Sequence, residues 1–202
     1  EALVQVHHSS ALPSLHIGLS DRKEAIRFIA FRGMMKIAPD AAVEEWPRLL
    51  NWLSATQMTA LVREFGKPML PLIERALGHS RAPVRQAALA ATVAFDKIDR
   101  LGLLAGLVRS TEFGDVRLQA LRMVIDEQGP AAVALLLDLA RDPDLAVRRA
   151  AVEALGAAGH AAAQAGDVAA TDVITALQAA LMDGDEGVRI GAAASILQVA
   201  GR

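Results

Sequence analysis

An internal repeat constrains the fold of this chain more than any other feature. A β-branched aliphatic residue directly precedes an arginine, with alanine three residues after that arginine, at five places: Ile26-Arg27, Val84-Arg85, Val116-Arg117, Val147-Arg148 and Val188-Arg189. The successive arginines are 58, 32, 31 and 41 residues apart. Repeats of about 30 residues explain the spacing if the first interval holds two repeats and the last holds one repeat with an insertion. We place that insertion at residues 160–170, and six repeats then fit the 202-residue chain.

The spacing around each arginine is that of a helix. The position three residues after the arginine is always alanine: Ala30, Ala88, Ala120, Ala151 and Ala192. Together with the positions one before and seven after the arginine, these alanines form a stripe on one helix face, and Thr92 is its only polar member. Another apolar segment precedes each of these helices, for example residues 130–140. The sequence therefore predicts a helix, a tight turn and a second helix in each repeat.

Helix pairs of this size must pack against one another, because a pair of about 30 residues cannot bury both of its faces alone. We therefore expect an all-α superhelix, or α-solenoid, of about six helix pairs. We expect it to form a single domain over residues 1–202, with an irregular segment at residues 1–13. Trp46 and Trp52, in the second repeat, are predicted to lie in its core, and the alternative is that they are exposed anchors for a partner.

Residues 142–156 carry a more specific pattern, Asp-Pro-Asp-x-x-Val-Arg-x-x-Ala-x-x-Ala-Leu-Gly. This pattern resembles HEAT repeats, especially the short bacterial kind named after phycobilisome lyases. The resemblance extends over residues 79–201 and 14–39, and it is weakest over 40–66, where no aliphatic-arginine anchor falls at the repeat spacing. It implies a solenoid in which the second helix of each pair lines a concave face.

Aspartates accompany the repeated arginines. An aspartate stands six residues before the arginine in three repeats, whereas His79 and Thr111 take that position in two others. The aspartates and arginines of this pattern are Asp21, Arg27, Arg85, Arg117, Asp142, Arg148, Asp183 and Arg189. An aspartate at the turn can accept hydrogen bonds from the exposed amides of the following helix, and arginine supplies several donors. The resemblance implies a ladder of such residues along the stack. We assign them a structural role.

Composition excludes several kinds of chemistry. The chain has no Cys and a single Asn, which removes disulfides, thiolate metal sites, cysteine nucleophiles and N-linked glycosylation. No phosphate-binding or hydrolase motif occurs, and Asp183 to Gly187 lacks the later ligands of a calcium loop. We therefore expect no catalytic residue, no metal and no cofactor.

Charge and hydropathy limit the partners and the compartment. The net charge is -2, and it splits into +3 over residues 1–101 (13 Lys and Arg against 10 Asp and Glu) and -5 over residues 102–202 (8 against 13). A continuous phosphate-binding track is therefore not favoured, and we do not expect nucleic acid as a partner. Charged residues interrupt the apolar runs, so we expect no membrane insertion and a cytoplasmic protein.

A protein partner fits the predicted concave face best. The positions one, five and nine residues after each arginine would face it, and our candidates among them are Phe28, Arg32, Lys36, Leu118, Arg122, Arg149 and Ile190. Apolar residues interleaved with arginine are typical of protein interfaces. Arg32 and Lys36 also lie near Arg22 and Lys23, in a basic region suited to an acidic partner. The sequence identifies neither the partner nor the oligomeric state.

The prediction is therefore a non-enzymatic scaffold that binds a protein partner through the concave face of a HEAT-like solenoid. Two alternatives stay open. The resemblance also covers HEAT-like enzymes or enzyme subunits, either bilin lyase-like or DNA glycosylase-like. The chain could equally be a structural spacer in a longer protein.

Overall fold

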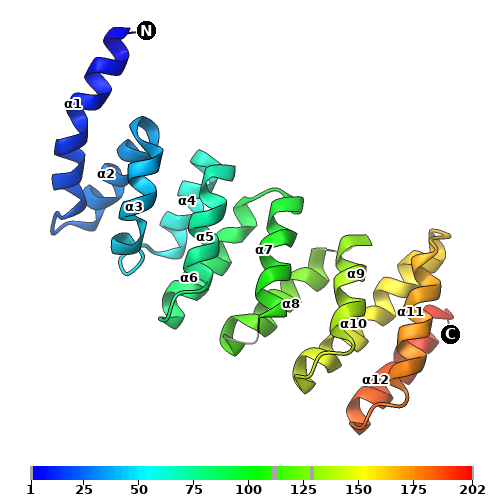
Figure 1. Cartoon of the computed structure of the whole chain (residues 1–202). Coiled ribbons are helices and arrows are strands. Elements are labelled where there is room, and N and C mark those ends of the chain that lie inside the picture. Colours follow the sequence, from blue (N-terminus) through cyan, green and yellow to red (C-terminus); the bar gives the residue numbers. More distant parts are fainter. Residues whose placement is uncertain (1, 111–112, 128–129, 202) are drawn as a thin grey trace. The chain divides into compact units, whose positions relative to one another are not determined.

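The structure is a computed structural model that describes residues 2–110, 113–127 and 130–201. These residues form helices, turns and loops, and no strand occurs among them. The chain divides into two compact units, residues 1–100 and residues 101–202. Figure 1 shows successive helix pairs within each unit.

The first unit contains three helix pairs. The first two are α1 (Ala2–Leu19) with α2 (Glu24–Ile37), and α3 (Pro39–Leu49) with α4 (Ala55–Phe65). The third is α5 (Leu70–Leu77) with α6 (Ala82–Ala91); the short 3-10 helix η1 (Lys67–Met69) precedes it and η2 (Thr92–Ala94) follows it. The second helices follow one another along the stack, because α2 contacts α4 and α4 contacts α6.

The second unit also contains three pairs. They are α7 (Lys97–Arg109) with α8 (Gly114–Glu127), α9 (Pro130–Leu139) with α10 (Leu145–Gln164), and α11 (Ala169–Ala180) with α12 (Glu186–Val199); α7 begins just before the unit boundary. Helix α10 is central, since it packs against α8, α9, α11 and α12.

The all-α fold class and the six helix pairs are confirmed in the described part of the chain. One local expectation is wrong. The segment 1–13 is not irregular, because α1 is helical from Ala2. Most of the insertion at residues 160–170 is helix, since it lengthens α10 to 20 residues against 14 in α8 and α12. Gly166, with φ 69°, follows the end of this longer helix. That residues 1–202 form a single domain stays a prediction.

The predicted stripe explains how the second helices pack. All five repeat alanines are buried, and so is the aliphatic residue before the arginine in four repeats. Ile26 differs, because it is 39% exposed. Small residues bring α10 and α12 close together: a Cβ added at Gly156 would lie 2.9 Å from the Cα of Ser195. Thr92 is buried as well, and its hydroxyl donates to the carbonyl of Leu89 at 2.7 Å.

The two tryptophans have different surroundings. Trp46 lies in the core, as predicted; its indole nitrogen donates to the carbonyl of Leu72 at 2.8 Å, and its ring lies 5.4 Å from that of Phe31. Trp52 is 54% exposed, so the core prediction for it is wrong. The reason is its position in the turn between α3 and α4, where its ring lies under the guanidinium of Arg27 at 4.5 Å.

Candidate functional site

The repeated arginines bond to the turn that precedes their own helix. In Arg27, Arg85, Arg148 and Arg189, Nη1 donates to the carbonyl six residues earlier at 2.7–2.8 Å and also to the carbonyl five residues earlier. Arg117 instead donates through Nε to the carbonyl of Val108 at 2.6 Å. These bonds satisfy carbonyls that the turn leaves without helical partners.

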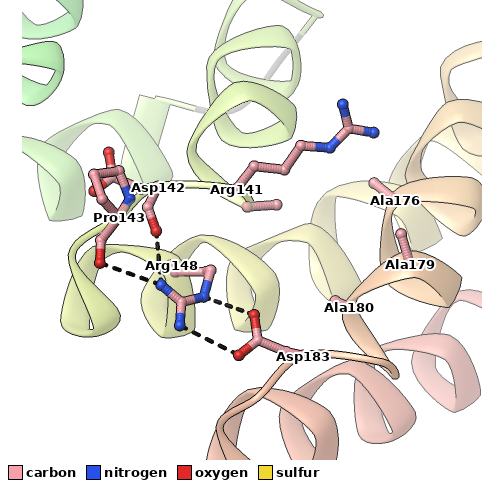
Figure 2. Close-up of a pocket in the computed structure, with 9 residues that line it drawn as sticks. Arg141, Asp142, Pro143, Arg148, Ala176, Ala179, Ala180 and Asp183 are labelled. Carbon is pink, nitrogen blue, oxygen red and sulfur yellow. Dashed lines mark hydrogen bonds and ion pairs between the residues drawn. The ribbon is translucent and has the colours of Figure 1, made fainter.

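In the second unit two arginines also reach the aspartate of the next repeat. Arg148 donates through Nε to Asp183 Oδ2 at 2.7 Å and through Nη2 to Asp183 Oδ1 at 3.2 Å (Figure 2). Arg117 pairs with Asp142 in the same way through Nη2, and both side chains are nearly inaccessible to solvent. The ladder pairs therefore join consecutive repeats, about one helix pair apart along the chain.

This geometry shifts the pKa of both groups in the Arg148–Asp183 pair. The hydrogen bonds from Arg148, and then the bond from the amide of Asp185, hold the pKa of Asp183 below its ordinary value. The same pairing raises the pKa of Arg148. Both side chains therefore stay charged, and the pair acts as a permanent link between α10 and the turn before α12.

The aspartates of the ladder act on the turn but do not cap the helix. Asp21, Asp142 and Asp183 each accept a hydrogen bond from the amide two residues later, at 2.7–2.8 Å. The N-caps of α10 and α12 are Asp144 and Asp185, which accept from helix amides. We missed this division of roles, although the recurring Asp-x-Asp spacing before both helices is its signal.

The ladder is not continuous over all the residues proposed for it. Within the described residues, no ion pair joins Asp21 or Arg189 to another member of the ladder. In the first unit, Arg27 stacks on Trp52 instead, and its Nε is buried without a hydrogen-bond partner among the described residues. Arg85 bonds to the carbonyls of His79 and Ser80.

Two predicted binding residues of the second unit, Arg149 and Ile190, border an open groove between α10 and α12. Its volume is about 480 Å³, and it is lined by Arg149 and Glu153 of α10 and mainly by Gly187, Ile190, Ala194 and Gln198 of α12. Ile190 is 63% exposed. Arg149 donates to Asp185 at 3.1 Å. The hydrogen bond from the Val188 amide lowers the pKa of Asp185 most, and the bond from Arg149 lowers it further.

The predicted basic region of the first unit is partly neutralised. Glu64 of α4 accepts from Arg32 Nε at 2.5 Å and from Lys36 Nζ at 2.8 Å. These two bonds, that of Arg32 being the stronger, lower the pKa of Glu64 to about 2. Phe28 is half-buried on the same helix, and the Arg32 guanidinium lies 5.8 Å from its ring centroid. Both basic side chains remain partly exposed, at 40% for Arg32 and 57% for Lys36, and their contact with an acidic partner stays a prediction.

The remaining two candidates lie on α8. Leu118 is half-buried and Arg122 is exposed. The structure thus brings Arg149 and Ile190 together in one groove, and it brings Phe28, Arg32 and Lys36 together on α2. Since the units are described separately, the surfaces of α2 and of α12 are separate candidates.

The stacked helix pairs define the class of this protein as an α-solenoid. A family model described as HEAT repeats matches residues 101–198, which span α7 to α12 apart from four residues of α7 and the last residue of α12. This part of the chain is similar to HEAT repeats, as the Asp-Pro-Asp pattern predicted. The closer relation to phycobilisome-lyase repeats stays a prediction.

The chain is also similar to two crystal structures of engineered proteins from the Northeast Structural Genomics Consortium. The first is 18% identical over 94% of this chain and 96% of that chain, with a TM-score of 0.48. The second is 19% identical over 95% of this chain and 58% of that chain, with a TM-score of 0.45. Similarity at this level says nothing about a partner. A comparison with curated proteins gave no match.

Two absences within residues 2–110, 113–127 and 130–201 bear on other kinds of site. None of the helices there has the length and apolar character needed to cross a membrane. In the same residues, no three His, Cys, Asp or Glu side chains are grouped so that they could hold a metal ion.

Proposed function

We propose that this protein is a non-enzymatic scaffold that binds a protein partner through the concave, second-helix face of its HEAT repeats. The groove between α10 and α12 is the main contact in this proposal. The exposed side chain of Ile190 is the observation that carries it.

The chemistry of the groove supports protein recognition. Ile190 supplies an apolar anchor, and the small side chain of Ala194, one helical turn further along α12, leaves room beside it for a side chain of the partner. The space at Gly187 is taken by the guanidinium of Arg149. Arg149 and Glu153 place charges at the edge of this apolar centre. An apolar centre with a charged rim is the usual arrangement of protein interfaces, in which a few central residues contribute most of the binding energy.

The charged side chains of Arg149 and Asp185, near the groove, bond to each other, and they do not form a catalytic centre in this proposal. Asp185 is held by Arg149 and by helix amides, and its pKa is lowered, so it is ionised at neutral pH. A general acid or base would instead need a pKa close to the working pH. This favours the scaffold over the enzyme alternatives.

Affinity capture from a lysate of the source cells tests the proposal. The bait is the full chain, compared with an Ile190→Asp variant and with the control variant Val168→Asp. Val168 is 84% exposed in the turn before α11, away from the groove. We expect specific proteins to be retained by the unchanged chain and by Val168→Asp, and lost with Ile190→Asp.

Other outcomes would contradict the proposal in different ways. Partners that survive Ile190→Asp would place the contact elsewhere on the molecule. If neither the unchanged chain nor the control retains any specific protein, the scaffold function loses its support. Changes at Arg32 or Lys36 are less suitable for this test, because they also remove the partners of Glu64.

A further inference from the structure

A second cavity lies between α8, α9 and α10, and it shares no residue with the α10–α12 groove. Its volume is about 460 Å³, within the range of roughly 300–1,000 Å³ for small-molecule sites. Five of its lining residues are alanines of α10, and Val133 and Leu136 of α9 are buried at its inner wall. We call this cavity the alanine-lined pocket.

The insertion at residues 160–170 builds one side of this pocket. The end of α10 contributes Ala161 and Ala162, the turn after it contributes Ala165 and Asp167, and the start of α11 contributes Ala169. Helices α8 and α12, which lack the insertion, are six residues shorter than α10. The repeat with the insertion therefore forms one side of this mainly apolar cavity.

Two carboxylates are the ionisable groups that line the pocket. Asp126 is at the end of α8, and within the described residues it forms no hydrogen bond or ion pair, even with Arg122 one helical turn earlier. Asp167 accepts a hydrogen bond from the amide of Ala169 at 2.9 Å, which fixes its carboxylate at the start of α11. Residues 102–202 carry a net charge of -5 (8 Lys and Arg against 13 Asp and Glu).

We propose that the alanine-lined pocket binds a small amphipathic cation, a molecule with a hydrocarbon body and one protonated amine. The apolar wall excludes strongly hydrated ligands, because an apolar cavity accepts apolar groups more readily than water. The two carboxylates favour a cationic head group and disfavour an anionic one. The pocket is thus separate from the protein-binding groove, and either site can fail without the other.

Three probes with the same hydrocarbon chain test the charge preference. Octylammonium, 1-octanol and octanoate would each be titrated into the full chain below their aggregation concentrations, with binding measured by isothermal titration calorimetry. We expect octylammonium to bind once per chain, about threefold to fivefold more tightly than octanol and more than tenfold more tightly than octanoate. Equal binding of the three probes, or tighter binding of octanoate, would overturn the proposal.

Two sets of variants locate the site. Ala157→Leu and Ala161→Leu fill the pocket from exposed helix positions, and both should abolish octylammonium binding. Ala163→Leu is the matched control, because Ala163 is exposed on the same helix and does not line the pocket. Circular dichroism should show the same helix content in all three.

The charge variants give the second test. Asp126→Asn and Asp167→Asn should weaken octylammonium binding to the level of octanol and leave octanol binding unchanged. If Ala157→Leu and Ala161→Leu bind the probe as the unchanged chain does, the pocket is not the site. If octanol binds as well as octylammonium, the pocket takes apolar groups alone, such as a side chain of a partner protein, and the cation assignment is wrong.

Discussion

Replacing Asp183 with alanine removes the best-defined link between two repeats. The substitution removes two hydrogen bonds from Arg148, at 2.7 and 3.2 Å, and one from the amide of Asp185 at 2.8 Å. The Arg148 and Asp183 side chains are only 18% and 15% exposed, so solvent replaces these bonds poorly. Hydrogen bonds to charged groups contribute about 1.5–3 kcal/mol each, and Arg148 keeps its bonds to two carbonyls. We therefore expect Asp183→Ala to lower the free energy of unfolding by about 3 kcal/mol.

Urea unfolding at pH 7, followed by circular dichroism, measures this loss. A double-mutant cycle with Arg148→Ala isolates the pair, and we expect a coupling free energy of about 1.5–2 kcal/mol. The Arg149–Asp185 pair is the control, because Arg149 is 46% exposed and its bond is longer, at 3.1 Å. Arg149→Ala should cost less than about 1 kcal/mol. If Asp183→Ala costs no more than Arg149→Ala, the ladder has no special role in stability.

The pH dependence provides an independent check of the same pair. The pKa of Asp183 is lowered in the folded protein, so its contribution to stability is complete above the unfolded pKa of about 3.9. That contribution is lost as the pH falls through the lower folded pKa. The difference in stability between the unchanged chain and Asp183→Ala should therefore be constant from pH 5 to 7 and should shrink below about pH 4.

Three further predictions concern other parts of the chain. The carboxyl of Glu64 should titrate with a pKa of about 2 by NMR, and stability that depends on this group should fall as the pH drops from about 4.5 towards 2; an ordinary pKa above 4 would contradict its bonds to α2. Acrylamide should quench the fluorescence of the exposed Trp52 but not that of the buried Trp46, and Trp46→Ala should cost about 3–5 kcal/mol against less than about 1 kcal/mol for Trp52→Ala. Gly156→Ala should destabilise because its Cβ would meet α12, whereas Gly106→Ala, with open space in α7, should stabilise by about 0.5–1 kcal/mol; denaturant midpoints that change in the same direction would refute this contrast.

The sequence predicted the fold well because the repeat imposes the same local requirement several times. An alanine that lets two helices approach is needed in each copy, so the pattern can be recognised without knowing the neighbour. The same reasoning failed for Trp52, because the second repeat lacks the arginine anchor and gives no register. A tryptophan in a turn and one in a helix cannot be distinguished by composition.

The candidate site was predicted less completely, because its contacts join residues that are far apart in the sequence. Arg149 and Ile190 were both named, but their shared groove depends on the packing of α12 against α10. Glu64 was missed as the partner of Arg32, 32 residues away, since it lies in the repeat without a clear pattern. Periodicity assigns residues to a helix face, whereas ion pairs between repeats depend on side-chain reach.

The ladder pairs that join consecutive repeats also predict which helices lose stability together when a pair is removed. In a solenoid, stability is the sum of the intrinsic stability of each repeat and the terms for the interfaces between them. The Arg148–Asp183 pair belongs to such an interface, so its loss should free α11 and α12 from α10 without changing α8 directly. Native-state hydrogen exchange of Asp183→Ala should therefore show faster exchange in α11 and α12 and nearly unchanged exchange in α8. Equal acceleration in all of these helices would mean that the second unit unfolds as one cooperative block, and that the pair stabilises the unit as a whole.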